Sequence, residues 1–251
     1  EIYYMKKYSC CIIVPCYNEG ERLPINDFEK FISNREDFAV LFVNDGSSDN
    51  TQVLIDSLVN KFSGKIFSYK LIKNSGKSEA VRQGFLYAFQ NINSDYYSYL
   101  DADLATPLEE LNRLYSIISE NKNWQIIFGS RFKRLGVNIN RKAYRHYFGR
   151  IIATFISMIL KLPIYDTQCG AKVFRKELAT KLFQSEFISR WLFDVEIFAR
   201  IIKQKGREAI YDIAFEEPLQ QWIEVGGSKI NFRDMIKVPI ELLRIKRKYK
   251  I

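Results

Sequence analysis

The sequence predicts an α/β fold with a mainly parallel central sheet and helices on both faces. Three observations support this. Short β-rich apolar runs alternate with helical patterns through the first half, polar residues directly follow several of these runs, and 47% of the 251 residues are hydrophobic, enough for a full core. The alternating order implies parallel strands joined by crossover helices. No Gly/Ser- or Pro-rich linker interrupts the chain, so we expect one main domain at 5–230 and a basic C-terminal helix at 231–251.

In the first half, apolar runs and helical periodicity alternate in order along the chain. The apolar runs predict strands at 10–15, 39–43, 66–72, 96–100 and 124–128. The periodic segments between them predict helices at 22–35, 51–62, 77–90 and 108–121. Pro24 and Pro107 suit helix entry, and Asp49 or Asn50 suits the cap of the second helix.

The second half is less regular. It predicts an apolar helix at 144–160, a strand-like stretch at 166–174, a helix at 191–205 and a basic amphipathic helix at 230–250. The longest apolar run, 151–160, is about half of the roughly 20 residues that a transmembrane helix needs. We therefore expect no segment to cross a bilayer, although this run could lie in the membrane interface.

Charge and cysteine content limit the function classes. The net charge of +9 favours an anionic partner, whether nucleotide phosphates, a lipid headgroup or nucleic acid, but it also fits a merely solvated basic surface. The four cysteines, none in a CxxC pattern, predict reduced core thiols in a cytoplasmic protein: Cys10, Cys11, Cys16 and Cys169. The single histidine, His146, excludes multi-histidine metal sites and argues against a Ser-His-Asp triad.

Polar residues follow three of the predicted strands at the point where each strand ends. They are residues 17–19, 44–47 and 101–103. Ligands of parallel α/β sheets bind at the carboxyl ends of the strands. Three such ends at one edge indicate a site more strongly than any single motif does.

Asp101 and Asp103 predict a metal site. Residues i and i+2 of an extended chain point the same way, so the two carboxylates lie on one side of the strand end. Such oxygens suit Mg²⁺ or Mn²⁺ that also binds substrate phosphates. Two acids in a surface loop are common, and the position directly after an apolar strand is what favours a metal here.

Two further turns at this edge suit a nucleotide. Gly46 permits a tight turn, and Asp45 is placed to accept hydrogen bonds from a base or ribose. The sequence Asn-Ser-Gly-Lys at 74–77 precedes a helix whose N-terminus, with Lys77, attracts phosphate. Taken alone, both segments also fit ordinary turn and helix-start chemistry.

Eight stretches, taken in order, carry a family resemblance. They are IIVPCYNE (12–19), VNDGSSDNT (43–51), NSGKSEAVRQGF (74–85), LDADLATP (100–107), FGSRF (128–132), DTQCGAKVF (166–174), RWLFDVE (190–196) and GSK (227–229). Together they resemble the family 2 glycosyltransferases, whose GT-A fold is a Rossmann-like nucleotide-sugar-binding fold. The DTQCG and RWLFDVE stretches are most similar to the branch that transfers sugars to polyprenyl phosphates, especially the dolichyl-phosphate glucosyltransferases.

The resemblance implies an inverting transfer from a nucleotide sugar, with UDP favoured over GDP and glucose favoured as the sugar. It implies that the nucleotide sugar contacts Pro15, Tyr17, Glu19, Asp45, Gly46, Lys77, Asp101, Ala102 and Asp103. It also implies that Asp101 and Asp103 hold Mg²⁺ or Mn²⁺. Some relatives carry a Gln two residues after the second Asp, where this chain has Ala105, so water or substrate would complete the metal's ligands.

The acceptor decides the remaining chemistry. A lipid monophosphate, with a second pKa of about 6, is already nucleophilic at neutral pH and needs cations rather than a base. Arg131 and Arg145 match acceptor-phosphate arginines of the resembled branch, although Gly149 stands where some relatives have a serine. A hydroxyl acceptor would instead need a general base, for which Asp194 is the candidate. The expected catalytic residues are therefore Asp103, Asp194, Arg131 and Arg145.

Three functions remain in competition. The first is transfer to a polyprenyl or dolichyl phosphate by an enzyme peripheral to the cytoplasmic face of a membrane, which the basic helix at 230–250 and the apolar helix at 144–160 would both suit. The second is transfer to a hydroxyl during surface or capsular glycan synthesis. The third, a nucleotide- or nucleic-acid-binding module, is disfavoured because the acids at the strand ends would repel phosphates unless a metal intervenes, and no RNA-binding signature is present.

Overall fold

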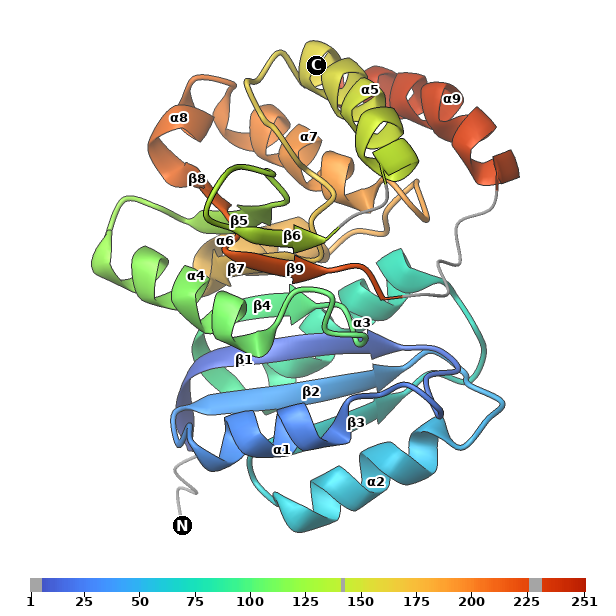
Figure 1. Ribbon diagram of the computed structural model, residues 1–251. Helices are drawn as coiled ribbons and strands as arrows, with labels where there is room; N and C mark the ends of the chain where they lie inside the picture. Colours follow the sequence, from blue (N-terminus) through green and yellow to red (C-terminus); the bar gives the residue numbers. More distant parts are fainter. Residues whose placement is uncertain (1–5, 141–142, 226–231) are drawn as a thin grey trace.

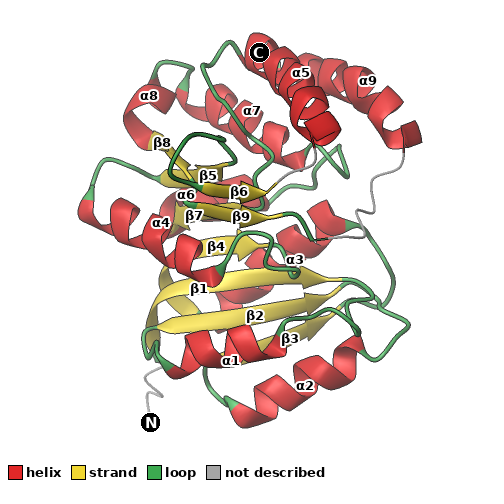
Figure 2. Cartoon of the chain, in the orientation of Figure 1, coloured by secondary structure: helices red, strands yellow, loops and turns green. Residues whose placement is uncertain are grey.

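A computed structural model describes residues 6–140, 143–225 and 232–251. Its centre is a seven-stranded sheet in the order β3-β2-β1-β4-β7-β5-β8 (Figures 1 and 2). Its strands are β1 (Lys7–Cys16), β2 (Phe38–Asn44), β3 (Ile66–Lys70), β4 (Asn93–Leu100), β5 (Ile126–Ser130), β7 (Ala171–Arg175) and β8 (Ala214–Pro218). Every pairing is parallel except those of β7, which runs antiparallel to both β4 and β5. The α/β fold with a mainly parallel sheet is confirmed.

Helices cover both faces of the sheet. They are α1 (Ile25–Ser33), α2 (Thr51–Lys61), α3 (Lys77–Asn91), α4 (Leu108–Glu120), α5 (Ala143–Leu160), α6 (Lys176–Phe183), α7 (Phe193–Lys205), α8 (Ala209–Ile213) and α9 (Phe232–Tyr249). One core cluster joins α3, α6 and α7 to the sheet, and the other joins α1, α2 and α4 to the opposite face. Adjacent residues of β1, such as Ile12 and Ile13, belong to opposite clusters because successive side chains of a strand point to opposite faces of the sheet.

The structure corrects several predicted elements. The predicted strand at 166–174 begins only at Ala171, because Asp166 is instead engaged by Arg131 in a loop. The strand predicted at 66–72 ends at Lys70, and Ile72 is fully exposed. The helix predicted from residue 22 begins at Ile25. The short elements α6, α8, β8 and the two-strand sheet of β6 (Asn138–Asn140) with β9 (Gln221–Ile223) were not predicted.

The C-terminal helix α9 packs on α7 and beside α5 (Figure 1). Leu242, Ile245 and Tyr249 form its buried face. Ile240 and Leu243 of the same helix are instead 57% and 51% exposed. Among the described residues, no helix is both long and apolar enough to cross a membrane.

All four cysteines are buried and free, as predicted. Burial raises the pKa of the Cys10 thiol to about 12 and that of Cys169 to about 11. These thiols therefore stay protonated at neutral pH and act as small apolar groups in the core.

Arg200 joins the α6–α7 connection to α9. Its guanidinium donates to the carbonyls of Leu182, Ser185 and Glu186 and to the Glu196 carboxylate, while its Nε donates to the Tyr249 hydroxyl at 3.2 Å. Both Arg200 and Glu196 are buried, at 5% and 0% exposure.

Replacing Arg200 by Ala leaves the Glu196 carboxylate buried without its cation. We expect the free energy of unfolding to fall by about 3–5 kcal/mol. Urea denaturation measures it, with exposed Lys205→Ala on the same helix as the control, expected to stay within about 0.5 kcal/mol of wild type. A loss no larger than the control's would contradict this role.

Candidate active site

Three strand ends meet at one edge of the sheet. Cys16 at the end of β1 pairs with Asn44 at the end of β2, and Ile13 of β1 pairs with Tyr99 of β4. The amide of Asp45 donates to the carbonyl of Cys16 at 2.8 Å, which joins the first two ends directly. The polar residues that follow β1, β2 and β4 therefore come to one rim, as the sequence predicts.

The loops after β1 and β2 are tied together by short polar contacts. The amide of Asn18 donates to the Ser47 hydroxyl at 3.0 Å, and the amide of Ser48 donates back to the Asn18 side chain at 2.9 Å. The amide of Glu19 donates to the Thr51 hydroxyl at 2.8 Å. Reciprocal bonds of this kind pre-form the rim before any ligand binds.

Asp45 connects the end of β2 to the start of α3. Its two carboxylate oxygens accept hydrogen bonds from the amides of Ser75 and Gly76, at 2.7 and 2.9 Å. Burial raises the pKa of Asp45, while these amides and the charge of Arg190 oppose that rise. The carboxylate predicted to meet the nucleoside therefore also shapes the turn that carries Lys77.

Gly46 makes this turn possible. Its φ of +65° is one that side chains with a Cβ rarely adopt, and a Cβ there would lie 2.6 Å from the Asn74 amide nitrogen. A larger residue would force the two turns apart. At the tight turn predicted at Gly46, the loop after β2 thus packs closely against the turn before α3.

Glu19 is buried and forms a two-bond ion pair with Arg22. The Arg22 Nε and Nη2 atoms lie 2.5 and 2.8 Å from the two Glu19 carboxylate oxygens. The hydrogen bonds from Arg22 to Glu19 raise the pKa of Arg22, and the negative charge of Asp103 raises it further. Glu19, predicted as a nucleotide-sugar contact, thus holds the Arg22 guanidinium close enough to interact electrostatically with Asp103. Sequence reasoning did not single out Arg22.

Lys77 and Asp101 form an ion pair at the centre of the rim. The Lys77 Nζ lies 2.5 Å from Asp101 Oδ1, which has no other hydrogen-bond partner among the described residues. Burial lowers the pKa of Lys77, but the charges of Asp101, Asp194 and Asp103 outweigh burial and raise it overall. The predicted phosphate-binding lysine and the predicted metal-binding aspartate are therefore neighbours.

Asp103 lies in the same acidic cluster. Burial, followed by repulsion from Asp101, raises the pKa of Asp103, while a hydrogen bond from the Ala105 amide at 3.1 Å opposes the rise. Ala102 between the acids is buried in the core, which explains its small side chain. Ionised Asp103 therefore gains from any cation bound at this point.

Gly170 lies directly against Asp101. A Cβ at this glycine would lie 2.2 Å from Asp101 Oδ2, and the Asp101 amide donates to the Gly170 carbonyl at 3.2 Å. The glycine belongs to the loop before β7, which runs antiparallel to β4. The DTQCG stretch thus leaves the space that the Asp101 carboxylate occupies.

Arg131 is held by Asp166. Its Nε and Nη2 donate to the two Asp166 oxygens at 2.7 and 2.8 Å, and Asp166 outweighs the effect of burial and raises the pKa of Arg131. Among the described residues, none accepts a hydrogen bond from Nη1. The guanidinium lies 5.5 Å from the centre of the Trp222 ring in β9. Arg131 can therefore offer one further pair of donors to an anion.

Asp194 lies at the start of α7 in a buried ion pair with Lys172 of β7. Their charged atoms are 2.6 Å apart, and the Tyr99 hydroxyl also donates to Asp194 Oδ1. Burial, then the charge of Asp194, raises the pKa of Tyr99 well above its usual value. Lys172 was not singled out from the sequence, although it lies within the quoted DTQCGAKVF stretch.

The remaining predicted residues divide into two groups. Pro15 and Tyr17 lie half-buried at the end of β1, on the rim. Arg145 lies in α5, but its side chain is outside the described residues, as is the whole Gly-Ser-Lys stretch at 227–229.

The rim suits a cation that binds together with a phosphate ligand. No three His, Cys, Asp or Glu side chains among residues 6–140, 143–225 and 232–251 form a cage for a metal ion. Asp101 Oδ1 is buried, and Lys77 is its only ion-pair partner among the described residues. Repulsion from Asp101 disfavours the ionised form of Asp103, so these two carboxylates are the oxygen groups that a cation would stabilise. Mg²⁺ and Mn²⁺ sites completed by substrate phosphates and water are built in this way.

Residues 11–183 match the family described as glycosyl transferase family 2. The chain belongs to this family. It is 32% identical to a dolichyl-phosphate β-glucosyltransferase of Dictyostelium discoideum, over 95% of this chain and 74% of the relative. Dolichyl-phosphate β-glucosyltransferases of Homo sapiens and Saccharomyces cerevisiae are each 30% identical, over 95% of this chain and 75% and 74% of theirs. The predicted branch of family 2 is confirmed.

Solved structures confirm the GT-A fold of this family 2 glycosyltransferase. Glucosyl-3-phosphoglycerate synthase from Mycobacterium tuberculosis, in complex with Mn²⁺, UDP-glucose and phosphoglyceric acid, superimposes with a TM-score of 0.70 at 12% identity, covering 96% of this chain and 79% of that one. Mannosyl-3-phosphoglycerate synthase from Rubrobacter xylanophilus gives a TM-score of 0.69 at 15% identity, covering 96% and 74%.

Because a Cβ at Gly170 would overlap the Asp101 carboxylate, Gly170→Ala should displace that carboxylate. We expect at least about a hundredfold lower transfer by this glycosyltransferase, since the displaced group belongs to the predicted metal site. Single-turnover assays measure it, and circular dichroism checks the fold. Gly64→Ala is the control: its φ of +77° makes a Cβ costly for stability, but nothing lies within 4 Å of that Cβ and the glycine is not at the rim, so it should retain transfer. Unchanged transfer by Gly170→Ala would contradict the assigned packing.

Proposed function

We propose that this enzyme transfers glucose, with inversion, from UDP-glucose to dolichyl or another polyprenyl phosphate. The observation that carries the proposal is the rim where Lys77 pairs with Asp101 beside Asp103, in a chain whose relatives over 95% of its length are dolichyl-phosphate β-glucosyltransferases. UDP and UDP-glucose are bound by solved structures of the same fold, which supports the choice of UDP over GDP.

The donor diphosphate would lie at the rim. Asp101 and Asp103 would hold Mg²⁺ or Mn²⁺, which would neutralise the charge of the departing diphosphate. Lys77, at the N-terminus of α3, adds a second cation and the positive end of the helix dipole. Pro15, Tyr17, Asp45 and Gly46 would surround the nucleoside, while Glu19 would act by holding Arg22 in place.

The acceptor phosphate needs cations rather than a base. Repulsion between a phosphate and the donor diphosphate costs roughly 3 kcal/mol per charge pair at about 5 Å and an effective dielectric constant of about 20. Arg131 offers the donors on Nη1 that Asp166 leaves unused, and Arg145 is the second proposed arginine. Guanidinium groups bind phosphate through two parallel hydrogen bonds, which a lysine cannot reproduce.

Transfer to a hydroxyl is the second candidate. In that reaction Asp194 would take up the hydroxyl proton. Asp194 is 4% exposed, and its Oδ1 already accepts hydrogen bonds from both Lys172 and Tyr99, so an acceptor hydroxyl has little access to this carboxylate. This arrangement favours the phosphate acceptor.

The acceptor assignment is tested by incubating the enzyme and Mn²⁺ with UDP-glucose or GDP-mannose and either dolichyl phosphate or dolichol. We expect β-linked glucosyl product only from UDP-glucose with dolichyl phosphate. Arg145→Ala should lower kcat/KM for dolichyl phosphate by about a hundredfold, and Arg145→Lys should restore little, because the bidentate contact is lost.

Calorimetric binding of UDP–Mn²⁺ to the Arg145 variants is the control, and it should match wild type. Arg145→Ala is the cleaner probe of the arginine pair, since removing Arg131 would also leave Asp166 without its partner. A fully active Arg145→Ala enzyme, or product formed only on the hydroxyl acceptor, would overturn the assignment.

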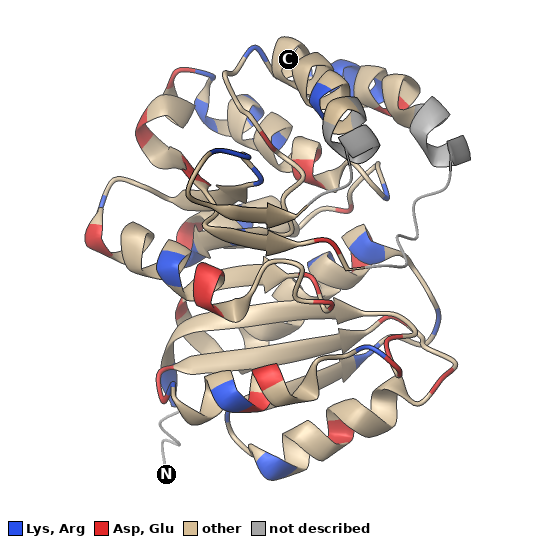
Figure 3. Cartoon of the chain, in the orientation of Figure 1, with Lys and Arg blue, Asp and Glu red and all other residues tan. Residues whose placement is uncertain are grey.

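The outer face of α5 and α9 supports contact with a membrane surface. Four apolar side chains of α5 lie on one helical face and are 55–70% exposed: Tyr147, Ile151, Phe155 and Met158. On the neighbouring helix α9, Ile240 and Leu243 are also exposed, and exposed cations follow them along the helix at Arg244, Lys246, Arg247 and Lys248 (Figure 3). An apolar stripe flanked by cations suits an anionic bilayer surface.

Flotation with phosphatidylserine-containing liposomes tests this contact. The double variant Ile151→Asp, Phe155→Asp should lower the bound fraction at least about tenfold, because two apolar anchors are lost. Val53→Asp, at an exposed apolar position on α2, is the control that should float like wild type. High salt should weaken wild-type binding. A wild-type protein that never floats would refute the membrane contact.

A further inference from the structure

A buried ion pair connects three elements beneath the rim. Lys172 of β7 and Asp194 of α7 have relative exposures of 0% and 4%. The Lys172 ammonium donates to Asp194 Oδ1 at 2.6 Å, to the Tyr99 hydroxyl at 2.8 Å and to the Cys169 carbonyl at 2.7 Å. All three of its N–H donors are therefore used, and the Tyr99 hydroxyl of β4 donates to the same Asp194 oxygen.

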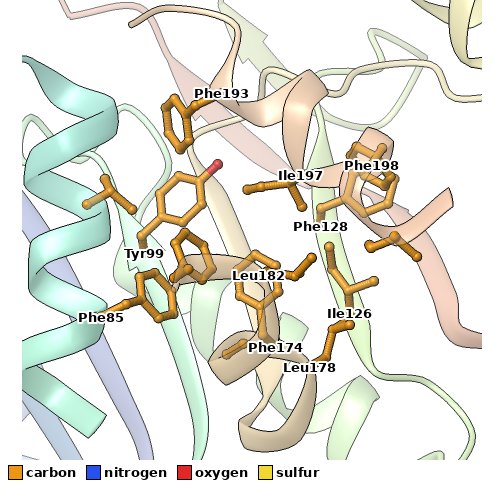
Figure 4. Packing of buried hydrophobic residues seen from close by; sticks show 14 of the residues in the cluster. Phe85, Tyr99, Ile126, Phe128, Phe174, Leu178, Leu182, Phe193, Ile197 and Phe198 are labelled. Carbon is orange, nitrogen blue, oxygen red and sulfur yellow. The ribbon is translucent and has the colours of Figure 1, made fainter. Parts of the chain in front are cut away.

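Aromatic side chains surround this ion pair. The Tyr99 ring lies 5.6 Å from Phe193 and 6.4 Å from Phe174, measured between ring centres. Figure 4 shows Tyr99 packed among Phe85, Phe174 and Phe193, with its hydroxyl toward the α7 side. The rings themselves offer no hydrogen-bonding group to replace a lost partner, so the Lys172 ammonium and the Asp194 carboxylate each lose a direct contact if the other is removed, although Lys77 is close enough to interact with the charge of Asp194.

The ion pair reaches the Asp101 carboxylate along two short routes. Lys172 holds the carbonyl of Cys169, and the next residue, Gly170, accepts the Asp101 amide and lies against the Asp101 carboxylate. On the other side, Tyr99 is bonded to Asp194 and precedes Asp101 by two residues in the chain. Both the strand that ends at Asp101 and the loop that faces Asp101 are thus attached to one ion pair.

A buried ion pair is weak evidence for stability, because well-packed apolar residues of similar size often stabilise a fold equally well. Its geometric consequence is different. An apolar pair could not donate to the Cys169 carbonyl or accept from the Tyr99 hydroxyl, so it would not tie the loop before β7 to β4. The arrangement therefore indicates that the ion pair serves to fix the position of the Asp101 carboxylate.

We propose that Asp194 is a positioning residue. Through Lys172 and Tyr99 it fixes Gly170 and Asp101 in the geometry that binds the donor diphosphate with its metal ion, and it takes up no proton during transfer. This proposal rests on the proposed function only for the location of the donor diphosphate at the rim. It deepens that function by giving the buried ion pair beneath the donor site a positioning role.

The test compares Asp194→Asn, Lys172→Met and the double variant carrying both changes. Calorimetry measures binding of the nucleotide–Mn²⁺ pair, UDP or GDP, that wild type binds, and transfer assays measure kcat. Asp194→Asn leaves a buried ammonium without its counter-charge, so we expect donor binding to weaken about tenfold or more, together with a lower melting temperature and a lower kcat.

The double variant separates the two roles of Asp194. It buries no uncompensated charge, and the amide that Asp194→Asn introduces can still accept a hydrogen bond from Tyr99. A positioning role therefore predicts recovery of the melting temperature, while donor affinity stays about tenfold or more below wild type in the double variant and in Lys172→Met, because an apolar side chain at position 172 cannot donate to the Cys169 carbonyl. Proton uptake by Asp194 instead predicts a stable double variant with wild-type donor affinity and a kcat as low as that of Asp194→Asn.

Two results would overturn the proposal. One is an Asp194→Asn protein with wild-type donor affinity and lost kcat, and the other is a stable double variant that binds the donor nucleotide with wild-type affinity. Glu110→Gln is the matched control, since this buried carboxylate also pairs with a cation, Arg113, but lies in α4 without contact to the ion pair. It should lower the melting temperature without weakening donor binding.

Failure of the proposed function gives a different pattern. If the acceptor or sugar is wrongly assigned, wild type still binds its nucleotide with Mn²⁺, and the effect of Asp194→Asn on that binding is measured independently of transfer. The affinity comparison among the three variants therefore tests the positioning role whatever the acceptor is.

Discussion

Repulsion among carboxylates at one edge of the sheet is the constraint to which the rest of the structure responds. Parallel pairing of β1, β2 and β4 brings acidic residues from three loops together. Several of these acids, and the groups that position them, are matched by cations from other parts of the chain. The matched pairs are Arg22 with Glu19, Lys77 with Asp101, Arg131 with Asp166 and Lys172 with Asp194.

These pairs differ in burial, and burial separates their roles. Lys172–Asp194 is almost inaccessible, whereas the Lys77 and Asp101 side chains are 31% and 36% exposed. An accessible pair can exchange partners when a metal ion and diphosphate bind, because water and ligand can replace each lost contact. An inaccessible pair cannot, so it suits a constant scaffold beneath groups that change partners.

The second half of the chain brings to the rim residues that surround the acids of the first half. The antiparallel strand β7 brings Gly170 and Lys172 to Asp101, and β5 leads into Arg131 beside it. Helices α5 and α9 then present an apolar and basic face on the outside of α7. The proposed donor site and the proposed acceptor contacts thus come from different parts of the sequence that share one sheet.

Much of the first half was predictable because its signals are local. A buried parallel strand such as β2 needs a continuous apolar run, and the helices between strands need their own periodicity. The short elements β6, β8 and β9 were missed because three to five residues carry too little periodicity to be recognised. The division between residues 230 and 231 stays a prediction.

The sequence by itself determined the fold class, the three polar strand ends and the family, because apolar runs and ordered motifs are properties of neighbouring residues. Only the tertiary structure decided which charges meet. Asp45 bonds to the turn before α3, Glu19 engages Arg22, and Asp194 is neutralised by Lys172. Except for the Arg22 pair, these contacts join residues at least 22 positions apart, and the energy of a charge depends on its spatial neighbours and burial, which no local pattern records.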